Sequence, residues 1–183
     1  MNEIDDITLE RAARGDRAAF GRLYAHYSPF VWRLCWRSSN GDRECATELV
    51  QNTFVKTYRY LRGFEKGSAL STWLYRIAYS CINEYFAKAA LHNSRTAAFD
   101  EEYMGAAQPH TPYEDQQLVA EILKPLNEAE RFLLTAREAD GLSYEELAVI
   151  TGDAAGALRT RLSRLKSEIR KRFEKMDCTA AAP

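Results

Sequence analysis

The sequence is short of glycine, proline and long apolar runs, and each shortage excludes a class of structure. Only nine glycines and five prolines occur in 183 residues, and alternating β-branched runs between turns are nearly absent, which argues against a β-rich fold. No apolar run approaches the roughly 20 residues that span a bilayer. The N-terminus, MNEIDDITLER, is acidic and lacks the apolar stretch of a signal peptide. We therefore expect an all-α cytoplasmic protein without direct membrane insertion.

Cysteine and histidine are also scarce and scattered. The four cysteines form no CxxC pair and have no ligand-like spacing to the three histidines, which are His26, His92 and His110. We expect buried thiols, no metal and no cofactor, with a zinc or disulfide site, or a sensing role for Cys178, as the alternatives. No paired carboxylates and no nucleophile–base set occur at a convincing spacing. The sequence therefore predicts a protein that is not an enzyme, and a metal- or thiol-based enzyme is the competing hypothesis.

Charge is unevenly distributed, and its distribution suggests domain boundaries. Residues 96–117 carry five acids and no Lys or Arg, so they cannot bury a core and we expect a flexible linker. On either side, helical period predicts one domain over residues 1–95 and another over 118–175, followed by a tail at 176–183. Residues 154–183 carry eight bases against three acids. This asymmetry indicates that the two ends of the chain meet different partners.

Helical period divides the first domain into three main helices. A long helix begins near Asp16 and contains Pro29, where we expect a kink or break. A second helix covers CATELVQNTFVKTYRYL, residues 45–61. A loop containing glycine and serine then leads to a third helix over residues 71–86, for which Ser71 is the expected N-cap.

The second domain has the sequence pattern of a helix-turn-helix. Ser143 and Glu146 have the spacing of a capping box at the start of one helix. Gly152 and Asp153 then form a tight turn, with glycine in the left-handed conformation and Asp153 as the expected N-cap of the next helix. That last helix begins near Ala154. Two helices joined by so short a turn are typical of DNA-binding helix-turn-helix motifs.

The last helix has an apolar stripe and an opposite basic face. The stripe consists of Leu158, Leu162, Leu165, Ile169 and Phe173. The other side offers guanidinium and hydroxyl groups, which can bond phosphates and the acceptor edges of bases in a major groove. A solvated basic helix is the structural alternative, but the turn, the capping box and the basic face together favour DNA binding.

Aromatic residues in the middle of the chain are interleaved with cations. Within the helix over residues 71–86, one apolar face is expected to be core, and it comprises Leu74, Ile77, Ala78, Cys81, Ile82 and Tyr85. Tyr75, Tyr79 and Phe86 form a separate stripe that either packs as structure or offers a platform for bases. The preceding segment adds Tyr58, Tyr60 and Phe64 with Lys56, Arg59, Arg62 and Lys66. Rings for stacking and cations for phosphates are what unpaired nucleic acid requires.

Two segments of the chain resemble a known family in the order that family requires. ELVQNTFVKTYRYLRGF and STWLYRIAYSCINEYF resemble region 2 of bacterial sigma factors, and GLSYEELAVITGDAAGALRTRLSRLKSEIRKR resembles their region 4. No room is left for a region 3 domain, which is typical of the extracytoplasmic-function (ECF) subgroup of the sigma-70 family. The resemblance implies two small helical domains joined by the acidic linker.

The resemblance also assigns site residues. It implies that the polymerase-binding residues are Glu48, Leu49, Val50, Gln51 and Phe54. It implies that the melted −10 strand is captured by Phe64, Lys66, Gly67, Ser68, Trp73, Arg76, Tyr79, Ser80 and Asn83. It implies that −35 DNA is bound by Arg159, Thr160, Ser163 and Arg164, with Arg161 and Lys166 suited to phosphates.

The implied function is that of a transcription initiation factor that directs core RNA polymerase to promoters. The implied partners are the β′ clamp helices and the β subunit of core polymerase, promoter DNA and an anti-sigma protein. The acidic linker would thread through polymerase near the active site, unless it is an inert tether. The alternative function is a dimeric helix-turn-helix regulator with an N-terminal sensing domain, which would protect a palindrome without polymerase.

Overall fold

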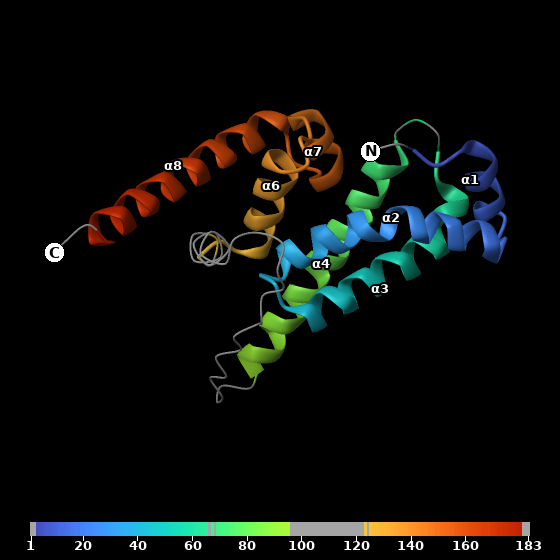
Figure 1. The fold of residues 1–183 in the computed structure, drawn as a ribbon, viewed down its shortest axis with the longest axis horizontal. Coiled ribbons are helices and arrows are strands. Elements are labelled where there is room, and N and C mark those ends of the chain that lie inside the picture. The colour runs from blue at the N-terminus through green and yellow to red at the C-terminus, as the bar shows by residue number, and fades with distance from the viewer. Residues whose placement is uncertain (1–2, 66, 68, 96–122, 124, 181–183) are drawn as a thin grey trace.

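The described part of the chain is built from helices and short connections. The computed structural model describes residues 3–65, 67, 69–95, 123 and 125–180, and no strand occurs among them. The α-helices are α1 (Asp6–Ala13), α2 (Arg17–Ser38), α3 (Arg43–Tyr60), α4 (Leu70–Arg95), α6 (Glu128–Glu138), α7 (Tyr144–Thr151) and α8 (Ala155–Ala180), and a 3-10 turn, η1, covers Leu61–Gly63 (Figure 1). The predicted all-α class is confirmed. The expected linker, residues 96–117, lies outside the described residues.

Aspartates cap the first three helices. The side chains of Asp5, Asp16 and Asp42 accept hydrogen bonds of 2.8 to 3.0 Å from backbone N–H groups in the first turns of α1, α2 and α3. These bonds satisfy donors that have no partner within the helix. Helix α2 begins directly after Asp16, as predicted, and runs through Pro29 without a break. The buried Phe30 that follows holds the next turn against the core.

Helix α4 begins earlier than predicted, at Leu70. Ser71 therefore lies inside the first turn and is not the N-cap; its hydroxyl and backbone N–H instead donate to the Glu3 carboxylate, at 2.7 and 3.3 Å. Four residues of the expected core face are buried, namely Leu74, Ala78, Cys81 and Ile82. Tyr75 is also buried, because helices from the second half of the chain cover it.

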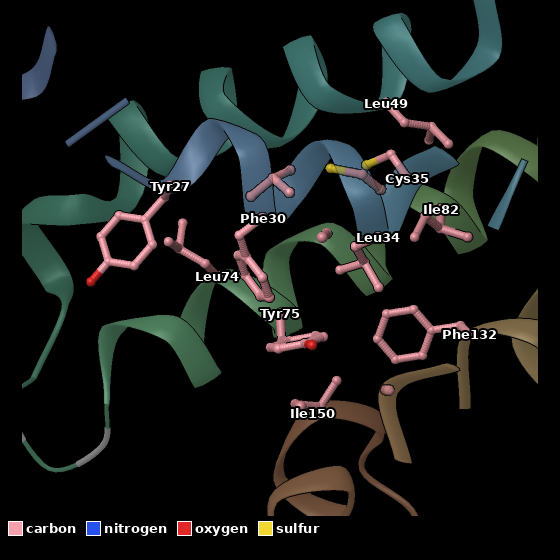
Figure 2. Packing of buried hydrophobic residues seen from close by; sticks show 14 of the residues in the cluster. Tyr27, Phe30, Leu34, Cys35, Leu49, Leu74, Tyr75, Ile82, Phe132 and Ile150 are labelled. Atoms are coloured by element: carbon pink, nitrogen blue, oxygen red, sulfur yellow. The ribbon is translucent and has the colours of Figure 1, made fainter. Parts of the chain in front are cut away.

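Helices α2, α3 and α4 enclose most of the core. Tyr27, Leu34, Leu49, Leu74 and Ile82 are essentially inaccessible to solvent there (Figure 2). Burial of such side chains contributes roughly 1.5–3 kcal/mol each. This core fixes the relative positions of the α3 and α4 surfaces that carry the candidate sites.

The helix-turn-helix is formed by α7 and α8. The Ser143 hydroxyl accepts from the Glu146 N–H at 3.1 Å, and the Glu146 carboxylate accepts from the Ser143 N–H at 2.7 Å, which confirms the predicted capping box. Gly152 is left-handed, with φ of 82°, as expected. Because α8 begins at Ala155, its N-cap position falls on Ala154 and not on Asp153.

The two halves of the chain pack against each other. Helices α6 and α7 lie on α2 and α4, while α8 extends away from the body (Figure 1). The Phe132 ring of α6 is fully buried and lies 4.6 Å from the Tyr79 ring and 6.2 Å from the Tyr75 ring, measured between centroids. Phe132 and Ile150 flank Tyr75 in Figure 2. The two halves of the chain are therefore joined by an apolar contact, which the sequence analysis did not predict.

Polar groups complete this contact at the end of α2. The buried Arg131 guanidinium donates to the carbonyls of Ser38 and Leu126, at 3.1 and 2.8 Å. Arg37 forms a salt bridge of 3.2 Å with Asp140. Burial lowers the pKa of Arg131, so the carbonyl oxygens are needed to compensate the loss of water around its charge.

Candidate nucleic-acid and polymerase interfaces

Helix α8 presents the predicted −35 residues on its exposed side. Leu158, Leu162 and Leu165 are buried, as predicted for the start of the apolar stripe. Within the predicted set, Arg161 is half-buried and the exposed residues are Arg159, Thr160, Ser163, Arg164 and Lys166. Farther along, Ile169 is half-buried and Phe173 is 41% exposed. The first three turns of α8 are thus anchored by one face and accessible on the other.

Several of these side chains already have partners within the protein. The guanidinium groups of Arg159 and Arg137 lie 5.1 and 4.7 Å from the centroid of the Tyr144 ring, which is cation–π geometry. Lys166 pairs with Glu138 at 2.6 Å. By contrast, no hydrogen bond or salt bridge among the described residues engages the side chain of Arg164. Arg164 is therefore the residue of this surface best placed for a new contact.

A second candidate surface is a pocket of about 370 Å³ between α3 and the start of α4, which we call the Trp73 pocket. Its lining consists of Lys56, Tyr60, Trp73, Arg76, Ile77, Ser80 and Glu84. Three of the predicted −10 residues, Trp73, Arg76 and Ser80, are thus brought together. Rings beside cations in a hollow of this kind can hold an unstacked base and its phosphate.

A charged pair closes one side of this pocket. The Lys56 ammonium donates to the Glu84 carboxylate at 2.6 Å, and the Ser80 hydroxyl donates to the same oxygen at 2.7 Å. Partial burial, the largest single effect, would lower the Lys56 pKa, but the hydrogen bond to Glu84 and the nearby acidic groups together outweigh it and raise the pKa. The hydrogen bond from Lys56 likewise lowers the pKa of Glu84. Both groups are therefore charged at neutral pH, and Lys56 cannot act as a base.

The other predicted −10 residues lie around this pocket or away from it. The Phe64 ring is 5.3 Å from the Trp73 ring and extends the aromatic surface toward the loop. Gly67 is exposed, as is Asn83 on α4, which does not line the pocket. Lys66 and Ser68 lie outside the described residues. Tyr79 is half-buried and packs on Phe132 of α6, so in this arrangement only part of its ring is accessible to DNA.

The third surface is a largely apolar groove of about 600 Å³ between α2 and α3, the α2–α3 groove. It is lined by Phe20, Tyr24, Trp32, Thr47, Val50, Gln51, Phe54, Val55, Tyr58 and Arg59. Tyr24, Val55 and Tyr58 are 44–47% exposed. Phe20 packs edge-on against Tyr58, and Tyr24 against Phe54, at centroid distances of 4.9 and 4.6 Å. Because exposed apolar side chains gather in this groove, it is a candidate surface for binding a protein.

The predicted polymerase-binding residues separate into three groups in the structure. Val50, Gln51 and Phe54 line the α2–α3 groove. Leu49 is fully buried and supports α3 from inside. Glu48 is exposed but faces the opposite groove, beside α4. The aromatic residues contributed by α2 were missed, because their exposure depends on how α2 and α3 cross.

The described cysteines are structural. Cys35, Cys45 and Cys81 are free thiols buried in the core, and burial raises the pKa of Cys35 to about 12 and that of Cys45 to about 11. The side chain of Cys178 lies outside the described residues. Over the described residues, no cluster of three or more potential metal ligands occurs, and no helix is long and apolar enough to cross a bilayer.

Sequence comparisons relate both halves of the chain to known proteins. Residues 23–91 match the family Sigma-70 region 2. The chain is 34% identical over 178 residues to the ECF RNA polymerase sigma-E factor of Escherichia coli (strain K12), and the match covers 90% of this chain and 92% of that protein. It is 30% identical over 184 residues to the RNA polymerase sigma-H factor of Pseudomonas aeruginosa, covering 94% and 95% of the two chains.

Solved structures give the same relationship. The sigma factor RpoE, solved in complex with the anti-sigma factor NepR from Bartonella quintana, aligns with a TM-score of 0.68 at 25% identity, over 85% of this chain and 96% of that chain. CnrH, solved with the cytosolic domain of CnrY, shares the fold with a TM-score of 0.65 at 22% identity, over 92% and 96% of the two chains. Because its similarity to ECF sigma factors extends over nearly the whole chain, in sequence and in fold, this chain belongs to the ECF RNA polymerase sigma factors.

Proposed function

We propose that this chain brings core RNA polymerase to promoters by using its three surfaces together. The α2–α3 groove contacts the β′ clamp helices, the Trp73 pocket captures the melted −10 strand, and α8 contacts −35 DNA. The observation that carries the proposal is the pairing, within one sigma-family chain, of a pocket suited to an unpaired base with a helix suited to duplex DNA. A dimeric regulator of duplex DNA needs no pocket for an unpaired base. Membership of the sigma family also does not favour that alternative function.

Each surface suits its proposed partner chemically. The α2–α3 groove offers apolar side chains rimmed by Gln51 and Arg59, which suits a helix with an apolar face. The Trp73 pocket offers Arg76 and Lys56 beside two aromatic rings. On α8, Arg164 and Ser163 are exposed within the first three turns, where a recognition helix contacts bases.

The packed arrangement of the two halves bears on this mechanism. Tyr79 is half-buried against Phe132, so its ring becomes fully accessible for stacking on DNA only after α6 moves away from α4. We propose that this separation accompanies binding to polymerase. The related RpoE was solved in complex with an anti-sigma factor, NepR. An anti-sigma protein that binds this chain and holds the halves together would keep the factor inactive. The protein would act in the cytoplasm, where polymerase and DNA are located.

Run-off transcription with purified core polymerase and a promoter library tests the proposal. We expect RNA starts at defined sites only when this chain is added. On a promoter found in this way, Arg164→Ala should weaken −35-dependent initiation by about 1–3 kcal/mol if the side chain contacts a base. An equal loss on promoters with altered −35 sequences would restrict Arg164 to phosphate contact. No defined start at any site, with the chain folded, would refute the function.

A further inference from the structure

Another hollow, of about 500 Å³, lies farther along the contact between α3 and α4. It shares Lys56 and Glu84 with the Trp73 pocket and Val55 and Arg59 with the α2–α3 groove. We call it the Lys88 hollow. Helix α3 contributes Glu48, Asn52, Val55, Lys56 and Arg59, and α4 contributes Cys81, Glu84, Tyr85, Lys88 and Ala89. Its volume lies in the range of sites that hold a small ligand or a nucleotide.

The Lys88 hollow is continuous with the Trp73 pocket. Lys56 and Glu84 line both, so their ion pair is the boundary between the two. Tyr60 and Trp73 meet at one end of the α3–α4 contact, whereas Glu48 and Lys88 meet nearer the other. The two hollows therefore form one continuous groove between the antiparallel helices α3 and α4. A DNA strand with one base in the Trp73 pocket can continue along this groove or extend into solvent.

The charges of the Lys88 hollow favour an anion. Glu84 already neutralises Lys56 at 2.6 Å. Arg59 and Lys88 are exposed, and neither takes part in a salt bridge among the described residues. The charge of Lys88 also helps to lower the pKa of Glu84. The lining carries three cations, Lys56, Arg59 and Lys88, against the two acids Glu48 and Glu84, which leaves one excess positive charge. An Arg fork and a Lys point charge on either side of a hollow are the groups that bind phosphates.

We propose that the Lys88 hollow holds the sugar–phosphate backbone of the same strand whose base occupies the Trp73 pocket, with Arg59 and Lys88 as phosphate contacts. This inference rests on the proposed function and extends it, because it adds a sequence-independent grip beside the −10 site. Tyr85 and Val55 give the hollow an apolar wall for the sugar. An acidic protein segment is the competing occupant, and the experiment below distinguishes the two.

The test measures how salt affects binding of single-stranded DNA to the complex of full-length chain and core polymerase. The probe is the non-template strand of a promoter found by run-off transcription, containing the −10 element and five nucleotides on either side. Each phosphate contact contributes about 0.7 to the slope of log K against log salt for single strands. Lys88→Gln should therefore lower the slope by about 0.7. The control is Arg43→Gln, which also removes an exposed cation from α3 but outside both hollows. It should leave the salt slope unchanged.

Neutral methylphosphonate linkages locate the contact. If the proposal is correct, a methylphosphonate at one or two linkages outside the −10 bases weakens binding of the probe to the complex that contains the unaltered chain. The same substitution does not further weaken binding to the complex that contains Lys88→Gln. Arg59 also borders the α2–α3 groove, so Arg59→Gln is interpreted only alongside its affinity for core polymerase. Unchanged unfolding midpoints in urea check that the variants are folded.

Two results would overturn the inference. An unchanged salt slope for Lys88→Gln, with sequence-specific −10 binding intact, removes the phosphate contact and leaves the proposed function standing. A loss of core polymerase affinity in Lys88→Gln, with the slope unchanged, assigns the hollow to a protein partner instead. If the unaltered complex shows no preference for the −10 sequence, the proposed function itself fails, and that outcome is distinct from both.

Discussion

The Glu3 carboxylate joins three segments that are far apart in the sequence. It accepts hydrogen bonds from the Tyr27 hydroxyl at 2.8 Å and from the Ser71 hydroxyl at 2.7 Å. Burial alone would raise the pKa of Glu3, but the hydrogen bonds from Ser71 and Tyr27 together outweigh it and lower the pKa below its ordinary value of 4.5. A carboxylate with a lowered pKa stabilises the folded state only while it is charged.

Glu3→Gln should therefore change how stability depends on pH. Because the pKa of Glu3 is lower in the folded state than in the unfolded state, its contribution is complete above about pH 5 and disappears as the pH falls through the folded-state pKa. We expect the variant to be less stable than the wild type at pH 7, with the difference shrinking in acid. Urea unfolding midpoints between pH 3.5 and 7 measure this, with Glu168→Gln on the exposed side of α8 as the matched change of charge. A difference that stays constant down to pH 3.5 would contradict the linkage.

At the scale of single residues, sequence reasoning placed side chains on a helix face but could not say what covers that face. Helical periodicity correctly placed Leu74 and Ile82 in the core. It left Tyr75 and Tyr79 at the wet boundary, and both turned out to pack against Phe132, 53 or more residues later in the chain. The clustering of Trp73, Arg76 and Ser80 was foreseeable from a resemblance, whereas Tyr60 joined them only through the crossing of α3 and α4.

At the scale of elements, helix starts are determined by competition among neighbouring polar residues. The capping box at Ser143 was predicted correctly because both of its partners have the required spacing. Near Ser71 and Asp153 no reciprocal pair of capping residues was identified, and the helices begin one or two residues away from the positions expected. A capping box satisfies two backbone N–H groups reciprocally, whereas a single capping side chain leaves more of them without a partner and fixes the helix start less firmly.

Ser143→Ala should destabilise the helix-turn-helix by about 1 kcal/mol. The substitution removes the acceptor of the 3.1 Å bond from the Glu146 N–H and leaves a donor at the start of α7 without its partner. Urea unfolding followed by circular dichroism measures the loss. Ser167→Ala, on the exposed side of α8, is the control and should change stability little. A loss of equal size in both variants would mean that the cap contributes nothing specific.

At the scale of the whole molecule, the sequence indicated two helical units but not their association. The acidic composition of residues 96–117 predicts a tether, and a tether permits any relative position of the units that it joins. Their association depends on shape and on apolar area at the surfaces of α4 and α6, which no local pattern encodes. Phe132 illustrates this. The helical period of its segment marks it as a buried residue, but does not show that it packs against the other helical unit.

The Phe132–Tyr79 contact should couple the two halves energetically. Tilted aromatic rings with a centroid distance of 4.6 Å are worth about 0.5–1.5 kcal/mol beyond their burial. We expect a double-mutant cycle of Phe132→Ala and Tyr79→Ala, measured by urea unfolding, to give a coupling energy in that range. A cycle of Phe132→Ala with Ile7→Ala, an exposed residue of α1, should give none.

The same contact should also determine the shape of the free protein. Tyr79→Ala truncates only the α4 side of the interface, so α6–α8 keeps its own core of Leu133, Leu147 and Leu162 while it loses apolar contact with α4. We expect small-angle scattering to show a larger radius of gyration for this variant than for the wild type, with helix content unchanged, because a weakened interface increases the population of separated halves. The increase should be greater when Arg37→Gln also removes the 3.2 Å salt bridge to Asp140. If both variants keep the wild-type radius of gyration, Phe132 and Tyr79 do not hold the halves together, and the packed arrangement depends on the Arg131 bond to Ser38 instead.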